Sequence, residues 1–187
     1  MNKKLIPTYV FKSIYDIDFN KIKDLGVKYL FVDLDNTLAS PYVYLPSKET
    51  ISLVKKIKEV GLNMFILSNN HEERVKKFAT PLDVSYLYEV KKPSIKKISK
   101  FVKENNIDPS LCLSIGDQVM TDVFASRRMN IITILVKAID RKTEVFTTKI
   151  NRKLEKFFLG RIKKKYPLIY KEKLLKYVEE KDDYKEV

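Results

Sequence analysis

The sequence has few of the residues that bind soft metals or form covalent cross-links. Its 187 residues include one cysteine, Cys112, and one histidine, His71. These counts exclude an intramolecular disulfide, a multi-cysteine zinc site and a multi-histidine metal site. Any bound metal must therefore be held by oxygen atoms, which favours Mg²⁺ over Zn²⁺. The scarcity of cysteine also favours a cytoplasmic location.

The chain also lacks long apolar runs and is poor in glycine. The longest apolar runs, 29–32 and 131–136, are much shorter than the ~20 residues that span a bilayer. The basic residues at 1–4 are not followed by the apolar segment of a signal peptide. Four glycines are too few for a collagen-like or linker-rich chain. We therefore expect a globular protein without a membrane-spanning segment.

Positive charge predominates. The chain has 37 Lys plus Arg and 24 Asp plus Glu, a net charge of +13. This excess favours polyanionic partners, namely phosphorylated substrates, anionic lipid surfaces or nucleic acid. A lysine-rich codon bias explains the same excess without any partner. Because hydrophobic residues make up 44% of the sequence, wholesale disorder is excluded.

Short apolar runs alternate with amphipathic ones. Strands are predicted at 28–34, 63–67, 84–88, 111–115 and 131–136, and helices at 47–60, 72–78, 93–104 and 120–129. This alternation predicts an α/β fold: a three-layer, Rossmann-like parallel sheet with helices on both faces.

The predicted core comprises residues 1–140, and residues 141–187 form a basic, mostly helical extension that packs on the core or projects from it. In this extension the spacing of Leu154, Phe157, Phe158 and Ile162 predicts an apolar helical stripe. We expect the stripe to pack on the sheet, and the exposed lysines of the extension to face anionic lipid.

Residues that can contribute to chemistry follow four of the predicted strands. They are Asp33, Asp35 and Thr37 after the first, Ser68, Asn69 and Asn70 after the second, Lys91 and Lys92 after the third, and Gly116, Asp117 and Asp122 after the fourth. Ligands of parallel sheets bind beyond the carboxyl ends of the strands, so these residues are expected to form one site.

The residue types at these strand ends suit phosphoryl transfer. Two carboxylates two residues apart share a face, so one can attack a phosphoryl group while the other acts as general acid and base. An Asp-rich and Asn-rich turn gives the same pattern without catalysis. Several acids around one point repel one another unless a cation lies among them, and Mg²⁺ meets that need.

The ordered motifs Asp-x-Asp-x-Thr, Ser, Lys-Pro and Gly-Asp-x-x-x-Thr-Asp resemble those of haloacid dehalogenase (HAD)-type phosphohydrolases. The resemblance implies that Asp33 is the nucleophile, that Asp35 is the acid and base, and that Lys92 neutralises charge. It implies phosphate binding by Thr37, Ser68, Asn69 and Lys92, and Mg²⁺ binding by Asp33, Asp35 through its carbonyl, Asp117 and Asp122.

A closer resemblance covers residues 5–160. Four motifs are similar to those of the uncapped (class IIIA) YqeG group, which is related to phosphatidylglycerophosphate phosphatases. They are Asp-Leu-Asp-Asn-Thr-Leu, Leu-Ser-Asn-Asn, Lys-Lys-Pro and, at 148–155, Thr-Lys-Ile-Asn-Arg-Lys-Leu-Glu. The sequence departs from that pattern at Ala125 and Ser126, where a Gly-Gly pair is common, and at Asn130, where a glycine is expected. Asparagine tolerates a positive φ, so the fold is not disturbed.

The loops after Thr37 and after Ser68 are too short to hold a cap domain. An open site favours a large or membrane-borne phosphorylated substrate. We predict a Mg²⁺-dependent phosphomonoesterase acting through an aspartyl-phosphate, with phosphatidylglycerophosphate as the leading substrate, at the inner face of the membrane. The alternatives are a phosphatase of nucleic-acid ends or phosphoproteins, and a non-catalytic RNA- or ribosome-associated protein. The second rests on charge alone, because no nucleic-acid-reading motif is present.

Overall fold

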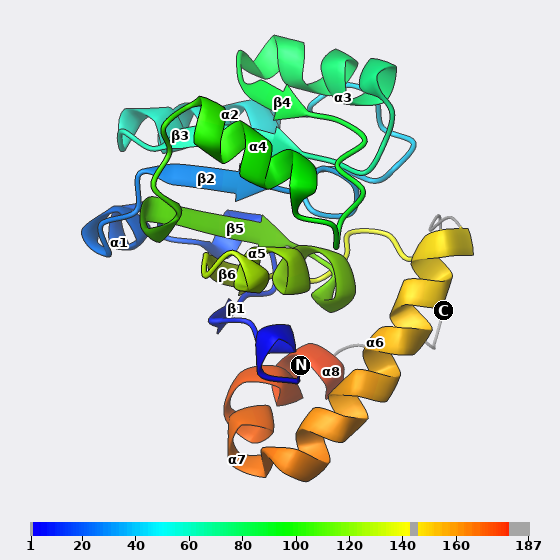
Figure 1. Ribbon diagram of the computed structural model, residues 1–187. Helices are drawn as coiled ribbons and strands as arrows, with labels where there is room; N and C mark the ends of the chain where they lie inside the picture. The colour runs from blue at the N-terminus through cyan, green and yellow to red at the C-terminus, as the bar shows by residue number, and fades with distance from the viewer. Residues whose placement is uncertain (1, 143–145, 180–187) are drawn as a thin grey trace.

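The protein is built on one parallel sheet of six strands. The computed structural model describes residues 2–142 and 146–179 (Figure 1). The strand order is β1-β6-β5-β2-β3-β4, and all neighbours are parallel. The strands are β1 (Tyr9–Val10), β2 (Tyr29–Val32), β3 (Asn63–Leu67), β4 (Ser85–Leu87), β5 (Cys112–Gly116) and β6 (Ile132–Leu135).

Helices cover both faces of the sheet, as the alternating pattern predicts. Successive residues of a strand face opposite sides, so Leu30 and Val32 join one apolar cluster and Phe31 joins another. The first cluster includes residues from α1 (Phe19–Asp24), α2 (Lys48–Glu59) and α3 (Glu72–Ala79). The second includes residues from α4 (Lys96–Glu104) and α5 (Phe124–Arg128). The predicted three-layer fold is confirmed.

Local sequence signals place most element boundaries. Ser47 caps α2 by accepting a hydrogen bond from the backbone N–H of Thr50 at 3.1 Å, as a helix beginning at 47 requires. The predicted helix at 93–104 begins later, at Lys96. The predicted helix at 120–129 is divided into a π-helical turn, η5 (Val119–Val123), and α5. Asn130 has a φ of 59°, which confirms that asparagine takes the left-handed backbone there.

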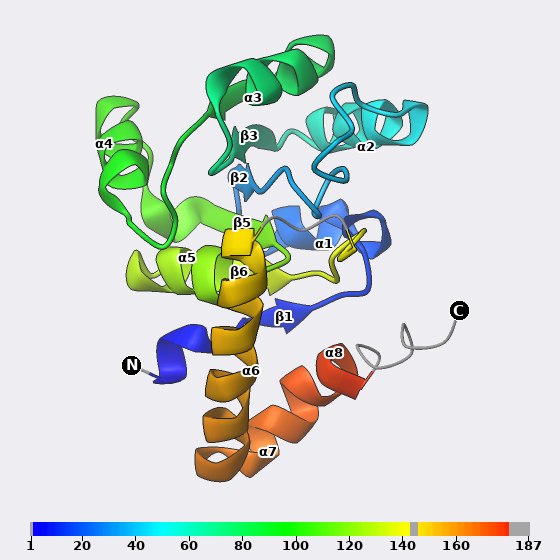
Figure 2. The ribbon, with the colours of Figure 1, turned by 90° about the vertical axis from the view of Figure 1, so that its right-hand side faces the viewer.

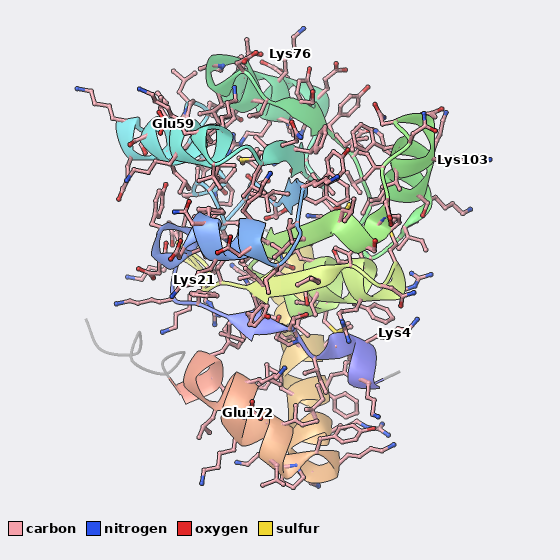
Figure 3. The ribbon with its side chains drawn as sticks, turned by 90° about the vertical axis from the view of Figure 1, so that its left-hand side faces the viewer. Lys4, Lys21, Glu59, Lys76, Lys103 and Glu172 are labelled. Atoms are coloured by element: carbon pink, nitrogen blue, oxygen red, sulfur yellow. The ribbon has the colours of Figure 1, made fainter. Side chains whose placement is uncertain are left out.

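The N-terminal residues form four elements that the sequence pattern did not indicate: η1 (Asn2–Leu5), β1, η2 (Ile14–Asp16) and α1. The short strand β1 pairs with β6 and forms one edge of the sheet. Ahead of it, the 3₁₀ turn η1 buries Leu5 against the C-terminal helices. Figure 3 views the side of the molecule opposite to the strand ends, where labelled lysine and glutamate side chains are interspersed.

The C-terminal extension consists of α6 (Phe146–Lys165), α7 (Pro167–Ile169), the π-helical turn η6 (Tyr170–Leu174) and α8 (Leu175–Glu179). Residues 143–145 and 180–187 of the predicted extension lie outside the described residues. Leu159 and Ile162 of α6 are buried in a cluster with Leu5 and Leu135. The domain boundary near residue 140 stays a prediction.

The prediction that an apolar stripe of α6 packs on the sheet is partly wrong. Ile162 is buried and Phe158 is partly buried, but Leu154 and Phe157 are 44% and 58% exposed. The helix instead turns Arg152, Glu155 and Leu159 inward, because the first two of these contact the loop after β5. None of the helices in the described ranges is both long enough and apolar enough to cross a membrane.

Candidate functional site

A cleft lies at the carboxyl ends of the strands, where polar residues from distant parts of the chain meet. Its volume is about 410 Å³. Figure 2 views this side of the molecule, with α6 in the foreground. The lining residues are Asp33, Asp35, Asn36, Pro41, Asn69, Asn70, Lys92, Gln118, Thr121, Thr148 and Asn151. The last two belong to α6, so the C-terminal extension forms one wall.

Asp33 lies directly after β2 at the floor of the cleft. Its Oδ1 accepts a hydrogen bond from Lys92 Nζ at 2.6 Å, and its Oδ2 accepts one from the hydroxyl of Thr37 at 3.2 Å. Burial raises the pKa of Asp33 well above its usual value, Lys92 opposes that rise, and the carboxylates of Asp122 and Asp117 add to it. The carboxylate is thus fixed in position by two donors.

Lys92 links two of the acids. Its Nζ donates to Asp33 Oδ1 and to Asp122 Oδ1, each at 2.6 Å, and to the carbonyl of Leu67 at 2.8 Å. Burial lowers the pKa of this lysine, but the two carboxylates outweigh burial, so the net pKa is raised and the side chain stays charged. Asn69 holds the backbone of Lys92 on both sides: its side chain accepts from Lys92 N at 2.7 Å and donates to the carbonyl at 3.1 Å.

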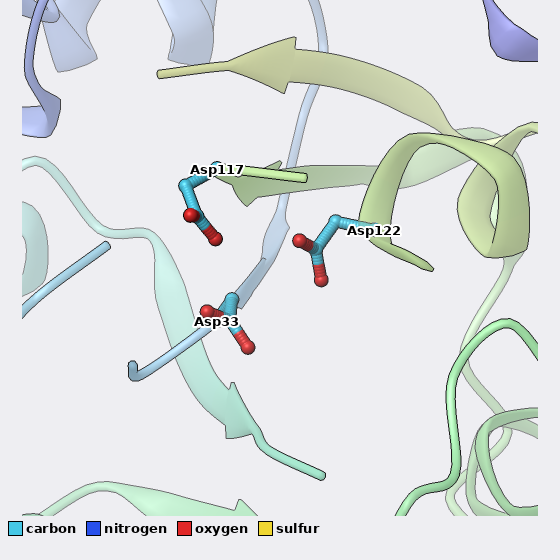
Figure 4. Close-up of side chains that lie close together, drawn as sticks. All are labelled: Asp33, Asp117 and Asp122. Atoms are coloured by element: carbon cyan, nitrogen blue, oxygen red, sulfur yellow. The ribbon is translucent and has the colours of Figure 1, made fainter. Parts of the chain in front are cut away.

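Three buried carboxylates converge beside this lysine (Figure 4). One oxygen from each of Asp33, Asp117 and Asp122 lies within 4.8 Å of the others. Gly116 permits the approach, because a Cβ there would lie 2.4 Å from Cγ of Asp122. Among the described residues, Asp117 Oδ1 is buried without a hydrogen-bond partner. An oxygen-liganding divalent cation fits this cluster, since it would satisfy that atom and relieve the mutual repulsion.

The C-terminal helices hold Asp117 in place, a contribution that sequence reasoning missed. Arg152 of α6 forms an ion pair with the Asp117 carboxylate and donates to the Asp117 carbonyl at 2.8 Å. The hydroxyl of Tyr177 lies within hydrogen-bond distance of two acceptors, the same carbonyl at 3.2 Å and the Glu155 carboxylate at 3.1 Å, and its single hydrogen can be donated to either. Burial raises the pKa of Asp117 to about 6 although Arg152 lowers it. The sequence signal for this contact is the motif at 148–155, to which the family resemblance assigns no role.

Asp35 also lines the cleft but is not part of the cluster of three acids. Its carboxylate accepts hydrogen bonds from Arg74 at 3.2 Å, from Asn70 at 3.1 Å and from Ser68 at 3.4 Å. Arg74 is 1% exposed, donates to the carbonyls of Ser40 and Pro41, and was also missed. An arginine on a predicted surface helix gave no signal that it would be buried.

The structure therefore brings most of the predicted site residues to one cleft. Asp33, Asp35, Asn69 and Lys92 line it, and Asp117 and Asp122 lie beneath it. The predicted phosphate ligands Thr37 and Ser68 are buried and are not among the lining residues; their hydroxyls contact the two carboxylates of the first motif. The individual roles of these residues stay predictions.

Sequence comparison agrees with this arrangement. Residues 1–139 match the family described as mitochondrial PGP phosphatase, in which PGP is phosphatidylglycerophosphate. The chain belongs to this family. It is a HAD-type phosphatase, as its motifs predicted, and the predicted enzyme class is confirmed.

Two relatives illustrate the similarity. The Bacillus subtilis protein described as probable phosphatase YqeG is 34% identical over 165 residues, which cover 88% of this chain and 95% of that protein. Phosphatidylglycerophosphate phosphatase 1, chloroplastic/mitochondrial, of Arabidopsis thaliana is 26% identical over 169 residues, 84% of this chain and 48% of that protein.

Among solved structures, a 3-deoxy-D-manno-octulosonate 8-phosphate phosphatase from Moraxella catarrhalis, determined with magnesium and phosphate ions, has a TM-score of 0.45 and 16% identity. The match covers 76% of this chain and 92% of that one.

Proposed function

We propose that this phosphatase is a Mg²⁺-dependent phosphomonoesterase that acts through an aspartyl-phosphate on a lipid phosphate in the membrane, with phosphatidylglycerophosphate as the leading substrate. The observation that carries the proposal is the convergence of Asp33, Lys92 and the two further acids at the floor of an open cleft. The buried lysine, and a divalent cation that the three carboxylates would hold, would both place positive charge beside the phosphoryl oxygens, where negative charge develops during transfer.

The proposed reaction has two steps. An oxygen of Asp33 attacks phosphorus, the bond from phosphorus to the ester oxygen breaks, and that oxygen takes a proton from Asp35. Water then attacks phosphorus, its proton returns to Asp35, and the bond between phosphorus and Asp33 breaks to release inorganic phosphate. Lys92 lies against Asp33 in the structure and neutralises charge on the phosphoryl oxygens.

A bound Mg²⁺ supplies further positive charge to the phosphoryl oxygens, and we propose that Asp33, Asp117, Asp122 and the carbonyl of Asp35 hold it. Thr37 and Ser68 contact the carboxylates of Asp33 and Asp35 from buried positions, so we propose that they position these two groups for the phosphate. Asn69 fixes the backbone of Lys92 and lines the cleft beside it.

The openness of the cleft supports a substrate larger than a metabolite. The described loop after Thr37 carries no cap domain, and a cleft of about 410 Å³ can hold a phosphorylated head group while the rest of a lipid stays outside. The naming of the Arabidopsis relative points to the same substrate class. We therefore propose action at the inner face of the membrane.

Phosphate release from purified protein tests this function. We expect Mg²⁺-dependent release from p-nitrophenyl phosphate and faster release from phosphatidylglycerophosphate in mixed micelles. Asp33→Asn should abolish both activities, while Asp24→Asn, at an exposed position on α1, should leave them unchanged. Release that persists in Asp33→Asn with EDTA present would contradict the mechanism. Preference for a phosphorylated oligonucleotide or phosphopeptide would contradict the substrate class.

A further inference from the structure

The exposed apolar side chains of this protein are concentrated beside the catalytic cleft. The described part of the chain leaves twelve large apolar side chains exposed, and eight of them lie in segments that border the cleft. These eight are Tyr42, Val43, Tyr44 and Leu45 of the loop after β2, Ile139 after β6, and Ile150, Leu154 and Phe157 of α6.

The loop 42–45 and α6 are tied to the cleft by their neighbours in the chain. Pro41 lines the cleft directly before Tyr42, and Thr148 and Asn151 line it on either side of Ile150. In Figure 1 the arrowheads of β2 and β5 point toward the side on which α6 lies, and Figure 2 looks onto that side. The cleft therefore opens between two apolar borders.

The outward apolar face of α6 belongs to none of the three apolar clusters of the described residues. Ile150, Leu154 and Phe157 have the spacing i, i+4 and i+7, which places them on one side of the helix. The opposite side carries Glu155, which is buried against the loop after β5, and Leu159, which is buried in the cluster with Leu5 and Leu135. Since packing within the chain uses only the inward side, the outward stripe remains for a partner.

The charge around this stripe is of one sign. Residues 146–165 contain eight Lys plus Arg and a single acid, Glu155, which is 1% exposed. Lys149, Lys153 and Lys156 lie next to the stripe on exposed positions, and the guanidinium of Arg161 lies 5.7 Å from the ring centre of Phe157. A second copy of the chain would bring the same positive charge to this face, so charge complementarity favours an anionic partner.

We propose that loop 42–45 and the outward face of α6, together the cleft-border surface, dock the enzyme on an anionic lipid bilayer with the cleft facing the headgroups. An amphipathic helix with apolar side chains on one face and lysines beside them lies in the interface of such a membrane. The aromatic rings of Tyr42, Tyr44 and Phe157 suit the headgroup level. The proposal rests on the proposed function for its biological purpose, but vesicle binding requires no catalysis.

Co-sedimentation with vesicles tests the surface. One set contains phosphatidylcholine alone, and the other contains phosphatidylcholine with 30 mol% phosphatidylglycerol. We expect at least tenfold tighter binding to the anionic set, and at least tenfold weaker binding for Leu154→Ser/Phe157→Ser and for Tyr42→Ser/Leu45→Ser. The matched control, Leu25→Ser/Ile51→Ser, removes two apolar side chains exposed elsewhere (52% and 44%) and should change binding less than twofold.

Two further measurements separate the outcomes. Circular dichroism and turnover of p-nitrophenyl phosphate should be unchanged in the Leu154→Ser/Phe157→Ser variant, which shows that the site is intact. Equal vesicle binding by all variants would overturn the proposal, and so would a dimer that this variant converts to a monomer, or RNA binding without vesicle binding. If the wild type docks but hydrolyses no lipid phosphate, the proposed substrate fails and the docking surface stands.

Discussion

Arg152→Gln should destabilise the protein more without Mg²⁺ than with it. The guanidinium of Arg152 contacts the carboxylate and carbonyl of Asp117, and its Nη1 lies 3.5 Å from Glu155. Its side chain is 12% exposed, so the pair is largely desolvated. Removing one partner of a buried pair costs about 3–5 kcal/mol. At ~2–4 °C per kcal/mol for a chain of this size, Tm should fall by roughly 6–20 °C in EDTA.

Mg²⁺ should reduce that loss. A divalent cation among Asp33, Asp117 and Asp122 supplies the positive charge that the variant lacks, so the variant gains more stability from the metal than the wild type does. The measurement is thermal unfolding of both proteins in EDTA and in saturating Mg²⁺. Lys153→Gln, at an exposed position of the same helix, should change stability by less than ~0.5 kcal/mol. If Arg152→Gln lowers the stability equally in EDTA and in Mg²⁺, Arg152 does not act by balancing the charge of the acid cluster.

Three further predictions concern Gly116, Asn130 and Asp117. Gly116→Ala should weaken Mg²⁺ binding measured by calorimetry and lower stability by about 1–3 kcal/mol, since its Cβ would lie 2.4 Å from Cγ of Asp122; unchanged metal binding would contradict it. Asn130→Ala should lower stability by about 1 kcal/mol in urea unfolding while Asn130→Gly should not, because φ there is 59°. Because the pKa of Asp117 is raised to about 6, the folded protein binds a proton that the unfolded chain has lost, so without Mg²⁺ its stability should fall as pH rises from about 4 to about 6. Protons compete with the metal for this carboxylate, so the apparent Mg²⁺ affinity should fall roughly tenfold per pH unit below 6. An affinity that is independent of pH over that range would argue against Asp117 as a ligand.

The sequence predicted the sheet and the strand-end residues because both depend on local patterns. Apolar runs of four to seven residues that alternate with amphipathic segments are typical of buried parallel strands, and parallel strands bring their carboxyl ends to one edge. These two rules are sufficient to predict that Asp33, Lys92 and Asp117 lie close together. The short edge strand β1 escaped prediction because two residues show no periodicity.

The partners of those residues depended on tertiary contacts that no local pattern encodes. Arg74 pairs with Asp35 across 39 positions, and Tyr177 reaches the Asp117 carbonyl across 60. Helix α6 has two stripes of residues, either of which could pack against the rest of the protein. The more apolar one was expected to pack, but the stripe with Arg152 and Glu155 turned inward because a buried carboxylate and backbone groups of the β5 loop require charged partners.

The orientation of α6 also shows that the site extends beyond the motifs at the four strand ends. Residues 1–139 match the family and contain every motif of the four strand ends. Yet Thr148 and Asn151 form part of the cleft wall, and Glu155 accepts the backbone N–H of Val119 at 3.0 Å, directly in the loop that carries the metal-side acids. One face of a single helix thus fixes that loop, while the other face bears the apolar stripe. A protein cut after residue 140 would retain the acids but lose a wall of the cleft and the contacts that hold Asp117 at its floor.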